Sequence, residues 1–351
     1  MPALPRSIVR WRALLAVLAV LASLNVAAAL GSLALATIDE RAHPPIGEFV
    51  TVEGRRLHFV RTSPPMPAPG TGADAAHGER AAVRTTDRLV TVLLHGGGTS
   101  LLDMHTSLSP ALLMRGHAVI AFDRPGHGYS DAWPGDASPD RQARLIRGAL
   151  AALEVERSVW VGHSRGAPVV LAALLVGAGA PGIDPVAGVL IAGVTQPAAG
   201  PPPPHVSILQ GDTLGPWFAW SAIEYAGRLA MPAVIETAFA PEAVPARYIE
   251  RTALDLSLRP RQARQDALER AAVDDWLEGA TSRYTRIGTP LLAVQGADDA
   301  VVPGERHLQP LRERVPVLAT RVLPGAGHGL LHTRTATVAD AIDAWMDALP
   351  R

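Results

Sequence analysis

The 351-residue sequence contains no cysteine and no lysine. Without cysteine the fold needs no disulfide, and the chain has no thiol to use as a catalytic nucleophile. Without lysine it has neither the lysine of a phosphate-binding P-loop nor one that could form a Schiff base. The formal net charge is −1, so the chain also lacks the basic footprint of a nucleic-acid-binding protein. These absences exclude thiol, Schiff-base and P-loop chemistry.

The remaining composition is that of a folded protein. Hydrophobic residues make up 48% and charged residues 19% of the chain, which is far from the composition of disordered proteins. A chain of this length can form one large α/β domain, or a domain with a lid, around an ample core.

The N-terminus carries a long apolar segment. A basic segment, residues 1–12, contains three arginines and precedes 24 uncharged residues, 13–36. About 20 residues suffice to span a bilayer as a helix, whereas the apolar core of a secretory signal has about 7–15. We therefore predict an uncleaved transmembrane anchor at 13–36. A signal cleaved after Ala34-Leu35-Ala36, and a buried helix, are the alternatives.

The charges around this segment predict its orientation. The arginines stand before it, while Asp39 and Glu40 follow it closely. Positive charge favours the cytoplasmic side of a membrane. We expect a single-pass protein whose main domain is extracytoplasmic, or a secreted protein if the signal is cleaved.

Strand and helix patterns alternate along much of the chain. Apolar runs predict strands at 89–94, 118–122, 158–161, 187–192, 291–294 and 320–323, with a hairpin at 48–61 turning near Gly54 and helices at 138–153 and 335–349. Such alternation implies a mostly parallel central sheet flanked by helices.

One long segment interrupts this alternation. Four consecutive prolines at 201–204 mark a linker, and the pattern that follows is helical. We therefore predict one α/β core in two parts, 37–195 and 286–351, separated by a helical lid at 196–285. Within the first part, the Pro- and Gly-rich residues 63–86 predict a flexible insertion.

The strongest chemical motif is Gly-x-Ser-x-Gly at residues 162–166. It follows an apolar strand and precedes a helix, which is the setting of a nucleophilic serine on a sharp turn. Glycines flank Ser164 because strand and helix backbones crowd there. The N–H groups at the start of the helix point at any anion that forms.

Partners for this serine follow at the ends of later strands. Asp298 and Asp299 come after the strand at 291–294, and His328 lies in a glycine-rich loop after the strand at 320–323. The carboxyl ends of parallel strands meet at one edge of a sheet, so these groups could converge on Ser164. A serine hydroxyl needs such a base and a group to orient it.

These segments make the chain similar to the α/β-hydrolase superfamily, in its lid-bearing branch of serine esterases, peptidases and haem-free haloperoxidases. The matching segments are Leu94–Gly98, Asp123–Asp131, the turn around Ser164, Asp299-x-x-Val302-Pro303 and Gly327-His328. The resemblance implies that Ser164 is the nucleophile, His328 the base and Asp299, rather than Asp298, the orienting acid. It also implies an oxyanion hole made by the backbone N–H groups of Gly97 and Arg165, with no metal or organic cofactor.

The function that the resemblance implies is hydrolysis of a carboxylic ester through an acyl-enzyme, with a hydrophobic acyl or alcohol part. Aromatic residues concentrated in the lid either pack the lid itself or form an apolar wall over Ser164: Trp217, Phe218, Trp220, Tyr225 and Phe239.

An amidase, aminopeptidase or perhydrolase could use the same triad, and a catalytically silent, membrane-tethered binding protein could keep the same fold. The expected partners are a small ester-like molecule and, through residues 13–36, a membrane. His95, His127 and His163 are expected to pack and to form hydrogen bonds.

Overall fold

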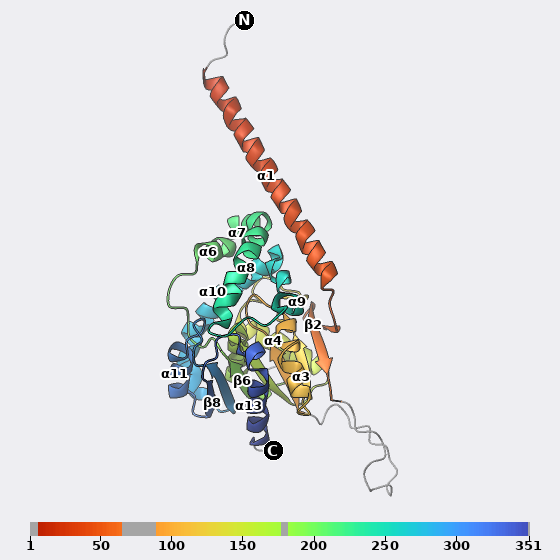
Figure 1. Ribbon diagram of the computed structural model, residues 1–351, viewed down its shortest axis with the longest axis vertical. Helices are drawn as coiled ribbons and strands as arrows, with labels where there is room; N and C mark the ends of the chain where they lie inside the picture. The colour runs from red at the N-terminus through yellow and green to blue at the C-terminus, as the bar shows by residue number, and fades with distance from the viewer. Residues whose placement is uncertain (1–5, 65–88, 177–181, 350–351) are drawn as a thin grey trace, which may run out of the picture.

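The computed structural model describes residues 6–64, 89–176 and 182–349. A sheet of eight strands forms the centre of the molecule and helices cover its faces, while one long helix extends away from this body (Figure 1). Most of the predicted insertion at 63–86 lies outside the described residues.

The strands are β1 (Glu48–Val52), β2 (Arg55–Thr62), β3 (Val90–Leu94), β4 (Ala118–Phe122), β5 (Ser158–His163), β6 (Pro185–Ile191), β7 (Leu291–Gly296) and β8 (Leu318–Leu323). They lie in the order β1-β2-β4-β3-β5-β6-β7-β8. β2 is antiparallel to β1 and β4, and every pairing from β4 to β8 is parallel. The predicted hairpin and the mostly parallel sheet are confirmed.

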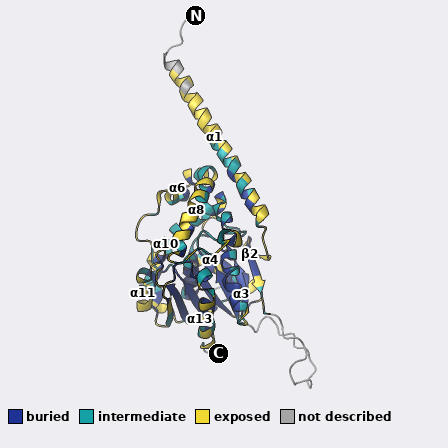
Figure 2. Ribbon diagram, viewed as in Figure 1, coloured by how far each residue is buried: buried dark blue, intermediate teal, exposed yellow. Residues whose placement is uncertain are grey.

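Helices from the core segments pack on the two faces of this sheet: α2 (Leu101–His105), α3 (Leu108–Leu113), α4 (Pro139–Ala152), α5 (Ala167–Val176), α11 (Gly304–Arg314), α12 (Leu330–Thr333) and α13 (Thr335–Asp347). Adjacent strand residues point to opposite faces. Trp160 accordingly packs in the core formed with α4, α5 and α11, and Val161 in the core formed with α2, α3, α12 and α13. The central strands are therefore buried on both sides, as Figure 2 shows.

A group of helices is inserted between β6 and β7. We call them the inserted helices: α6 (Pro204–Gln210), α7 (Leu214–Phe218), the π-helical turn η3 (Ala219–Ile223), α8 (Glu224–Phe239), α9 (Tyr248–Thr252), the 3₁₀ turn η4 (Leu254–Leu258), α10 (Pro260–Ala280) and the 3₁₀ turn η5 (Thr281–Arg286). From Pro204 to Arg286 the segment contains helices and turns and no strand; the lid predicted from the sequence spans 196–285.

Helix α1 (Arg6–Ala42) is longer than the predicted segment 13–36 at both ends. Its residues 10–42 are long and apolar enough to cross a membrane, and the most apolar part is not buried by the rest of the chain. Towards its C-terminus it contacts η3, η4 and α8 (Figure 1). The helix continues past the acidic pair Asp39 and Glu40, whose side chains form ion pairs with Arg228 of α8 and with Arg259, which directly precedes α10. The sequence pattern does not reveal these contacts.

Candidate active site

Ser164 lies on the sharp turn between β5 and α5, at the start of the 3₁₀ turn η2 (Ser164–Gly166). Its φ is +50°, a left-handed conformation that side-chain-bearing residues rarely adopt. A Cβ at Gly162 would lie 2.5 Å from the carbonyl oxygen of Gly166, and one at Gly166 would lie 2.3 Å from that of Leu94. Both positions therefore need glycine, which accounts for the spacing of the motif.

The structure brings the three predicted side chains together at the carboxyl ends of β5, β7 and β8. The Oγ of Ser164 is 3.1 Å from Nε2 of His328, whose Nδ1 is 2.9 Å from Oδ2 of Asp299. The backbone N–H groups of Val301 and Val302 donate to Oδ1 of Asp299 at 2.9 and 2.8 Å, which fixes the carboxylate.

The two neighbouring acids have different environments. Asp299 is buried and contacts His328, whereas Asp298 is exposed. The geometry therefore pairs the histidine with Asp299.

Burial sets the protonation of the histidine. It lowers the pKa of His328, and the hydrogen bond that His328 donates to Asp299 offsets this only in part. Burial alone would raise the pKa of Asp299, but the hydrogen bond and charge of His328 and the N–H groups of Val301 and Val302 lower it overall. At neutral pH His328 is therefore uncharged, with Nε2 free to accept a proton, beside a charged Asp299.

The loop after β3 lies against Ser164. A Cβ at Gly96 would be only 3.2 Å from the Cβ of Ser164. Gly97 lines the same pocket as Ser164 and Arg165. The backbone N–H of Arg165 belongs to the first turn after β5, where helix N–H groups favour negative charge. The two predicted oxyanion-hole residues thus border the space above Ser164.

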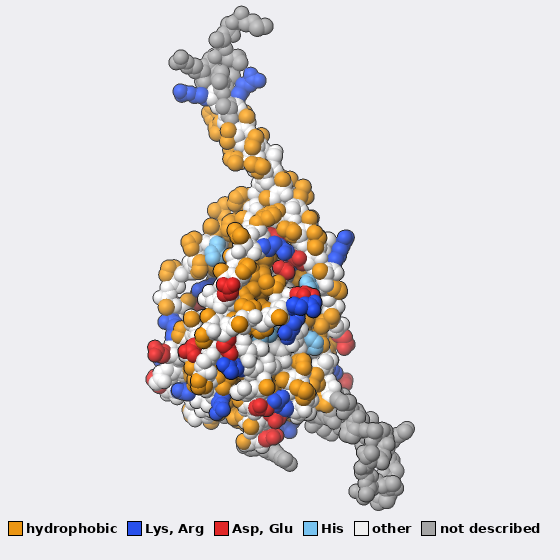
Figure 3. Space-filling view, viewed as in Figure 1, with side chains coloured by type: hydrophobic (Ala, Val, Ile, Leu, Met, Phe, Trp, Pro, Cys, Tyr) orange, Lys and Arg blue, Asp and Glu red, His pale blue; other side chains and the backbone are white. Residues whose placement is uncertain are grey.

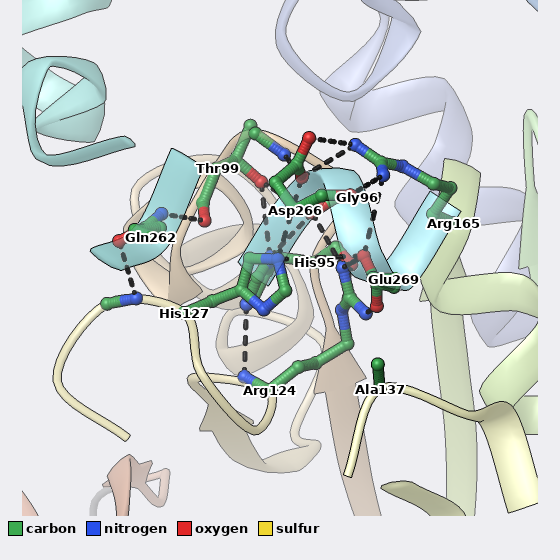
Figure 4. Close-up of polar contacts among 12 residues, drawn as sticks. His95, Gly96, Thr99, Arg124, His127, Ala137, Arg165, Gln262, Asp266 and Glu269 are labelled. Carbon is green, nitrogen blue, oxygen red and sulfur yellow. Dashed lines mark hydrogen bonds and ion pairs between the residues drawn. The ribbon is translucent and has the colours of Figure 1, made fainter. Parts of the chain in front are cut away.

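A side chain of helix α10 holds this loop in place (Figure 4). Nη2 of Arg165 donates to both carboxylate oxygens of Asp266 at 2.6 and 2.7 Å, and the N–H of Gly98 donates to the same carboxylate at 2.5 Å. A Cβ at Gly97 would lie within 2.0 Å of the Arg165 guanidinium. Sequence reasoning missed Asp266 because it occupies an ordinary helical position with no motif around it.

A second contact between α10 and the core lies deeper. Glu269 forms an ion pair with Arg124, and neither side chain is exposed. Arg124 also donates to the carbonyl oxygens of His95 and Gly96, at 2.8 and 3.0 Å. Burial alone would raise the pKa of Glu269, but the charges of Arg124, His127 and Arg165 lower it to about 2. The carboxylate therefore stays charged and stabilises the loop that follows β3.

The neighbouring histidines form hydrogen bonds here. Nε2 of His95 accepts from the N–H of Arg124 at 3.0 Å, and its Nδ1 lies 2.7 Å from the carbonyl oxygen of Gly96, so Nδ1 carries the proton. Nδ1 of His127 lies 3.2 Å from the carbonyl oxygen of Pro125.

The same region contains three side chains of the types that bind metal ions. Among the described residues, His127, Asp266 and Glu269 have potential ligand atoms within 4.8 Å of one another. Both carboxylates, however, already pair with the guanidinium groups of Arg165 and Arg124, and a cation there would lie beside these two positive charges. These residues do not fit a metal site.

A pocket of about 420 Å³ lies over Ser164, between the core and the inserted helices. Its apolar wall includes Met231, Ile235 and Phe239 from α8 and Leu254 from η4. The position of this wall favours a hydrophobic group next to the serine.

The aromatic residues of the inserted helices separate into three environments. Phe239 lines the pocket, and Phe218 packs against a small core among the helices. Trp217, Trp220 and Tyr225 are exposed on the outer surface. The expectation that these five side chains pack the lid or cover Ser164 is therefore wrong for three of them, because they lie on the outward side of η3, α7 and α8.

The pocket also has a polar wall, which sequence reasoning missed. Asp103 is buried and accepts hydrogen bonds from Nε2 of His332 at 2.8 Å and from the hydroxyl of Tyr248 at 3.1 Å, while Nδ1 of His163 lies 3.7 Å away. All four residues line the pocket. Burial alone would raise the pKa of Asp103, but the two imidazoles lower it well below its usual range. Four separate elements supply these residues, so no local pattern reveals the cluster.

This sheet order, with serine, histidine and aspartate meeting at the carboxyl ends of its strands, defines the class of α/β-hydrolase folds. The sequence matches the model of the Alpha/beta hydrolase family over residues 91–341, and the chain belongs to that family. Uncharacterized proteins of Mycobacterium tuberculosis and Mycobacterium bovis are 26% identical to it over 317 residues, which cover 85% of this chain and 86% of theirs.

Solved structures share the fold. An esterase from Exiguobacterium antarcticum is 18% identical, with a TM-score of 0.64, over 86% of this chain and all of its own. A bromoperoxidase from Bacillus anthracis is 16% identical, with a TM-score of 0.61, over 84% of this chain and 96% of its own. The resemblance to a superfamily that includes esterases and haloperoxidases is confirmed.

Proposed function

We propose that this protein is a serine hydrolase that cleaves a carboxylic ester with a hydrophobic acyl or alcohol part. The observation that carries this proposal is the continuous hydrogen-bonded series from Ser164 through His328 to Asp299. Membership of the Alpha/beta hydrolase family and the structural likeness to an esterase support it.

In the first step, Oγ of Ser164 attacks the ester carbonyl carbon while its proton passes to Nε2 of His328. The carbonyl oxygen becomes an oxyanion, which the N–H groups of Gly97 and Arg165 stabilise. One such donor is worth about 3–4 kcal/mol in the transition state. His328 then gives its proton to the departing alcohol, which leaves the acyl group on Ser164.

In the second step, a water molecule attacks the acyl-enzyme. His328 accepts a proton from the water, the oxyanion forms again at the same N–H groups, and Oγ of Ser164 departs with the proton that His328 returns. Asp299 stabilises the imidazolium in both steps. The products are a carboxylic acid and the free enzyme.

Amide cleavage and perhydrolysis use the same three residues and are the alternative reactions. The apolar wall formed by Met231, Ile235 and Phe239 favours an ester with a hydrophobic part. A panel of p-nitrophenyl esters of increasing acyl length, assayed beside an aminoacyl-anilide and a peracid-forming assay, decides between them. We expect the highest kcat/KM for an ester with an acyl chain longer than acetyl; a faster amide or peracid reaction would contradict the ester assignment.

Labelling with a fluorophosphonate tests whether Ser164 is a reactive nucleophile. We expect the full-length protein to be labelled and Ser164→Ala to be unlabelled. Ser257→Ala is the matched control, because Ser257 lines the same pocket and should not affect labelling. A folded wild-type protein that resists labelling would favour the catalytically silent binding protein instead.

We also propose that α1 anchors the protein in a membrane, with the hydrolase domain on the extracytoplasmic side. Arg10 and Arg12 at one end of the apolar helix support this orientation. Ser32 and Ala36 are buried, although the apolar stretch that precedes them is exposed. A signal that is cleaved after Ala36 would have no reason to pack in this way, so the contact favours an uncleaved anchor.

A further inference from the structure

The outward surface of the inserted helices is apolar. Seven of the sixteen large, exposed hydrophobic side chains outside α1 in the described chain lie between residues 208 and 234, and they form what we call the apolar surface: Ile208, Leu214, Trp217, Trp220, Tyr225, Leu229 and Val234. Figure 3 shows hydrophobic side chains gathered where α1 meets these helices. Scattered exposed hydrophobic residues are normal, but their concentration on one group of helices is typical of an interaction surface.

Helix α8 shows most clearly that water is not the natural surrounding of this surface. Met231, Ile235 and Phe239 line the pocket on one side of the helix, while Tyr225 and Leu229 are exposed on the other. α8 also carries three charged residues, Glu224, Arg228 and the exposed Glu236, but both of these sides present apolar side chains. An apolar helix face is expected to pack against apolar material. Here the protein supplies that material on one side only.

Helix α1 indicates how deep this surface lies relative to a bilayer. A helical span that starts after Arg12 and crosses a hydrocarbon core of about 30 Å ends about 20 residues later, near Ser32. The hydroxyl of Tyr225 donates to the carbonyl oxygen of Ala28, inside this span. The hydroxyl of Tyr225 therefore lies about one helical turn inside the end of this span.

The next contacts along α1 follow the order expected at a membrane–water interface. Trp220 borders a groove with Leu33, Ala36 and Thr37, about one turn beyond the end of the span. Charged pairs follow, with Glu40 contacting Arg259 at 2.8 Å. Trp and Tyr are enriched at this level of membrane proteins, and charges lie beyond it.

The pocket opens on the same face. Among the described residues that line it, only His205, Ala230 and Val234 are exposed, and they belong to α6 and α8. Val234 is also part of the apolar surface. The exposed part of the pocket lining therefore belongs to α6 and α8 and borders that surface.

We propose that the apolar surface inserts into the leaflet next to it, and that the substrate is a membrane-resident ester that enters the pocket directly from the lipid phase. This inference rests on the proposed function, and it adds the source and the physical class of the substrate. A bilayer is the occupant that the structure favours because the membrane-spanning helix stands beside the surface. The aromatic residues and the charges also follow the depth profile of an interface.

The position of the surface can be measured without an activity assay. The chain has no cysteine, so Leu229→Cys and Met114→Cys each introduce a single labelling site in the full-length protein. The two side chains are matched, with 86% and 82% exposed, but Met114 follows α3 on the body of the molecule. A fluorophore at each site is quenched either by doxyl-labelled lipid in phosphatidylcholine vesicles or by iodide in the water.

We expect doxyl lipid, and not iodide, to quench the fluorophore at residue 229, and the reverse at residue 114. Quenching by iodide at both sites would overturn the proposal. Protection of residue 229 from both quenchers would also overturn it, because the surface would then be covered by a second copy or another protein.

Activity on two esters with the same chromophore tests where the substrate comes from. p-Nitrophenyl acetate is soluble in water, whereas p-nitrophenyl palmitate is dissolved in the vesicles. For Leu229→Glu we expect palmitate hydrolysis to fall about tenfold, the loss expected when a leucine side chain leaves an apolar phase, with acetate hydrolysis within about twofold of wild type. The matched Met114→Glu variant should hydrolyse both esters at the wild-type rate.

The outcomes separate the two proposals. If wild type hydrolyses both esters and Leu229→Glu changes neither rate, entrance from the membrane is wrong while the hydrolase assignment stands. If wild type hydrolyses neither ester, the proposed function is wrong, and the fluorescence result still decides whether the surface lies in lipid. The acetate rate of Leu229→Glu also reports whether the variant is folded.

Discussion

At the scale of single residues, two adjacent carboxylates differ only in their surroundings. Asp299 contacts His328 and is fixed by backbone N–H groups, while Asp298 faces solvent. We predict that Asp299→Asn lowers kcat/KM for a soluble ester by about 10³–10⁴-fold, because the amide cannot stabilise the imidazolium and favours the wrong tautomer. Asp298→Asn should stay within about twofold of wild type. Equal losses in the two variants would show that the orienting acid is misassigned.

The pKa of His328 gives a second prediction. The general base must be neutral, and burial lowers the pKa of this imidazole below its ordinary value of about 6.5. Activity should therefore be lost only as the pH falls through a midpoint below about 6.5, and kcat/KM should be flat above it near neutral pH. A pH profile at constant ionic strength measures this, with circular dichroism showing that the protein stays folded. A midpoint at or above 6.5 would contradict the proposed role.

The meeting of Ser164, His328 and Asp299 could be predicted because each lies in a local pattern. Ser164 has its flanking glycines, His328 its glycine-rich loop, and Asp299 a strand end before it. Asp266 and Asp103 have no such pattern. Their partners come from helices and loops that are distant in sequence, so only the packing of α10 and α2 shows what they do.

At the scale of elements, Glu269 of helix α10 pairs with Arg124, which donates to the loop that follows β3. Replacing Glu269 with glutamine leaves Arg124 buried with no opposite charge from this position. We predict that Glu269→Gln lowers the free energy of unfolding by about 3–5 kcal/mol. Glu278→Gln is the matched control on the exposed side of α10 and should change it by less than about 0.5 kcal/mol. Denaturation midpoints measure both variants. If both lose a similar free energy of unfolding, the ion pair between Glu269 and Arg124 does not account for the loss.

The strands were the most predictable elements because buried parallel strands form continuous apolar runs. The predicted strand at 118–122 coincides with β4, and the others differ from the structure by a few residues. Short helices such as α2 and α3 carry too few residues for a period to be visible. The length of α1 was underestimated for another reason, since its acidic end is stabilised by tertiary ion pairs.

At the scale of the whole molecule, the sequence pattern indicates where the helices are inserted. It does not indicate which faces of these helices point towards the pocket and which point outwards. The apolar positions of α8 follow no single stripe, so periodicity could not tell the pocket side from the outer side. The position of α1 beside η3 and α8 resolves this, because it shows which side of the inserted helices would lie nearest a bilayer.

The last prediction concerns the orientation of the whole chain. Alkaline phosphatase is active only after export, so we expect activity when it is fused after Ala42 and none when it is fused after Arg12. β-Galactosidase fused after Ala42 should behave in the opposite way, because it is active only in the cytoplasm. A silent but expressed phosphatase fusion after Ala42 would refute export.

The mass of the mature protein then separates an anchor from a cleaved signal. We expect the intact mass of the membrane fraction to retain residues 1–36. A soluble chain that begins at residue 37 would have lost Ala28, the backbone partner of Tyr225, together with the buried Ser32. The inserted helices would then expose still more apolar surface to water, so the packing of α1 itself argues that the helix stays attached.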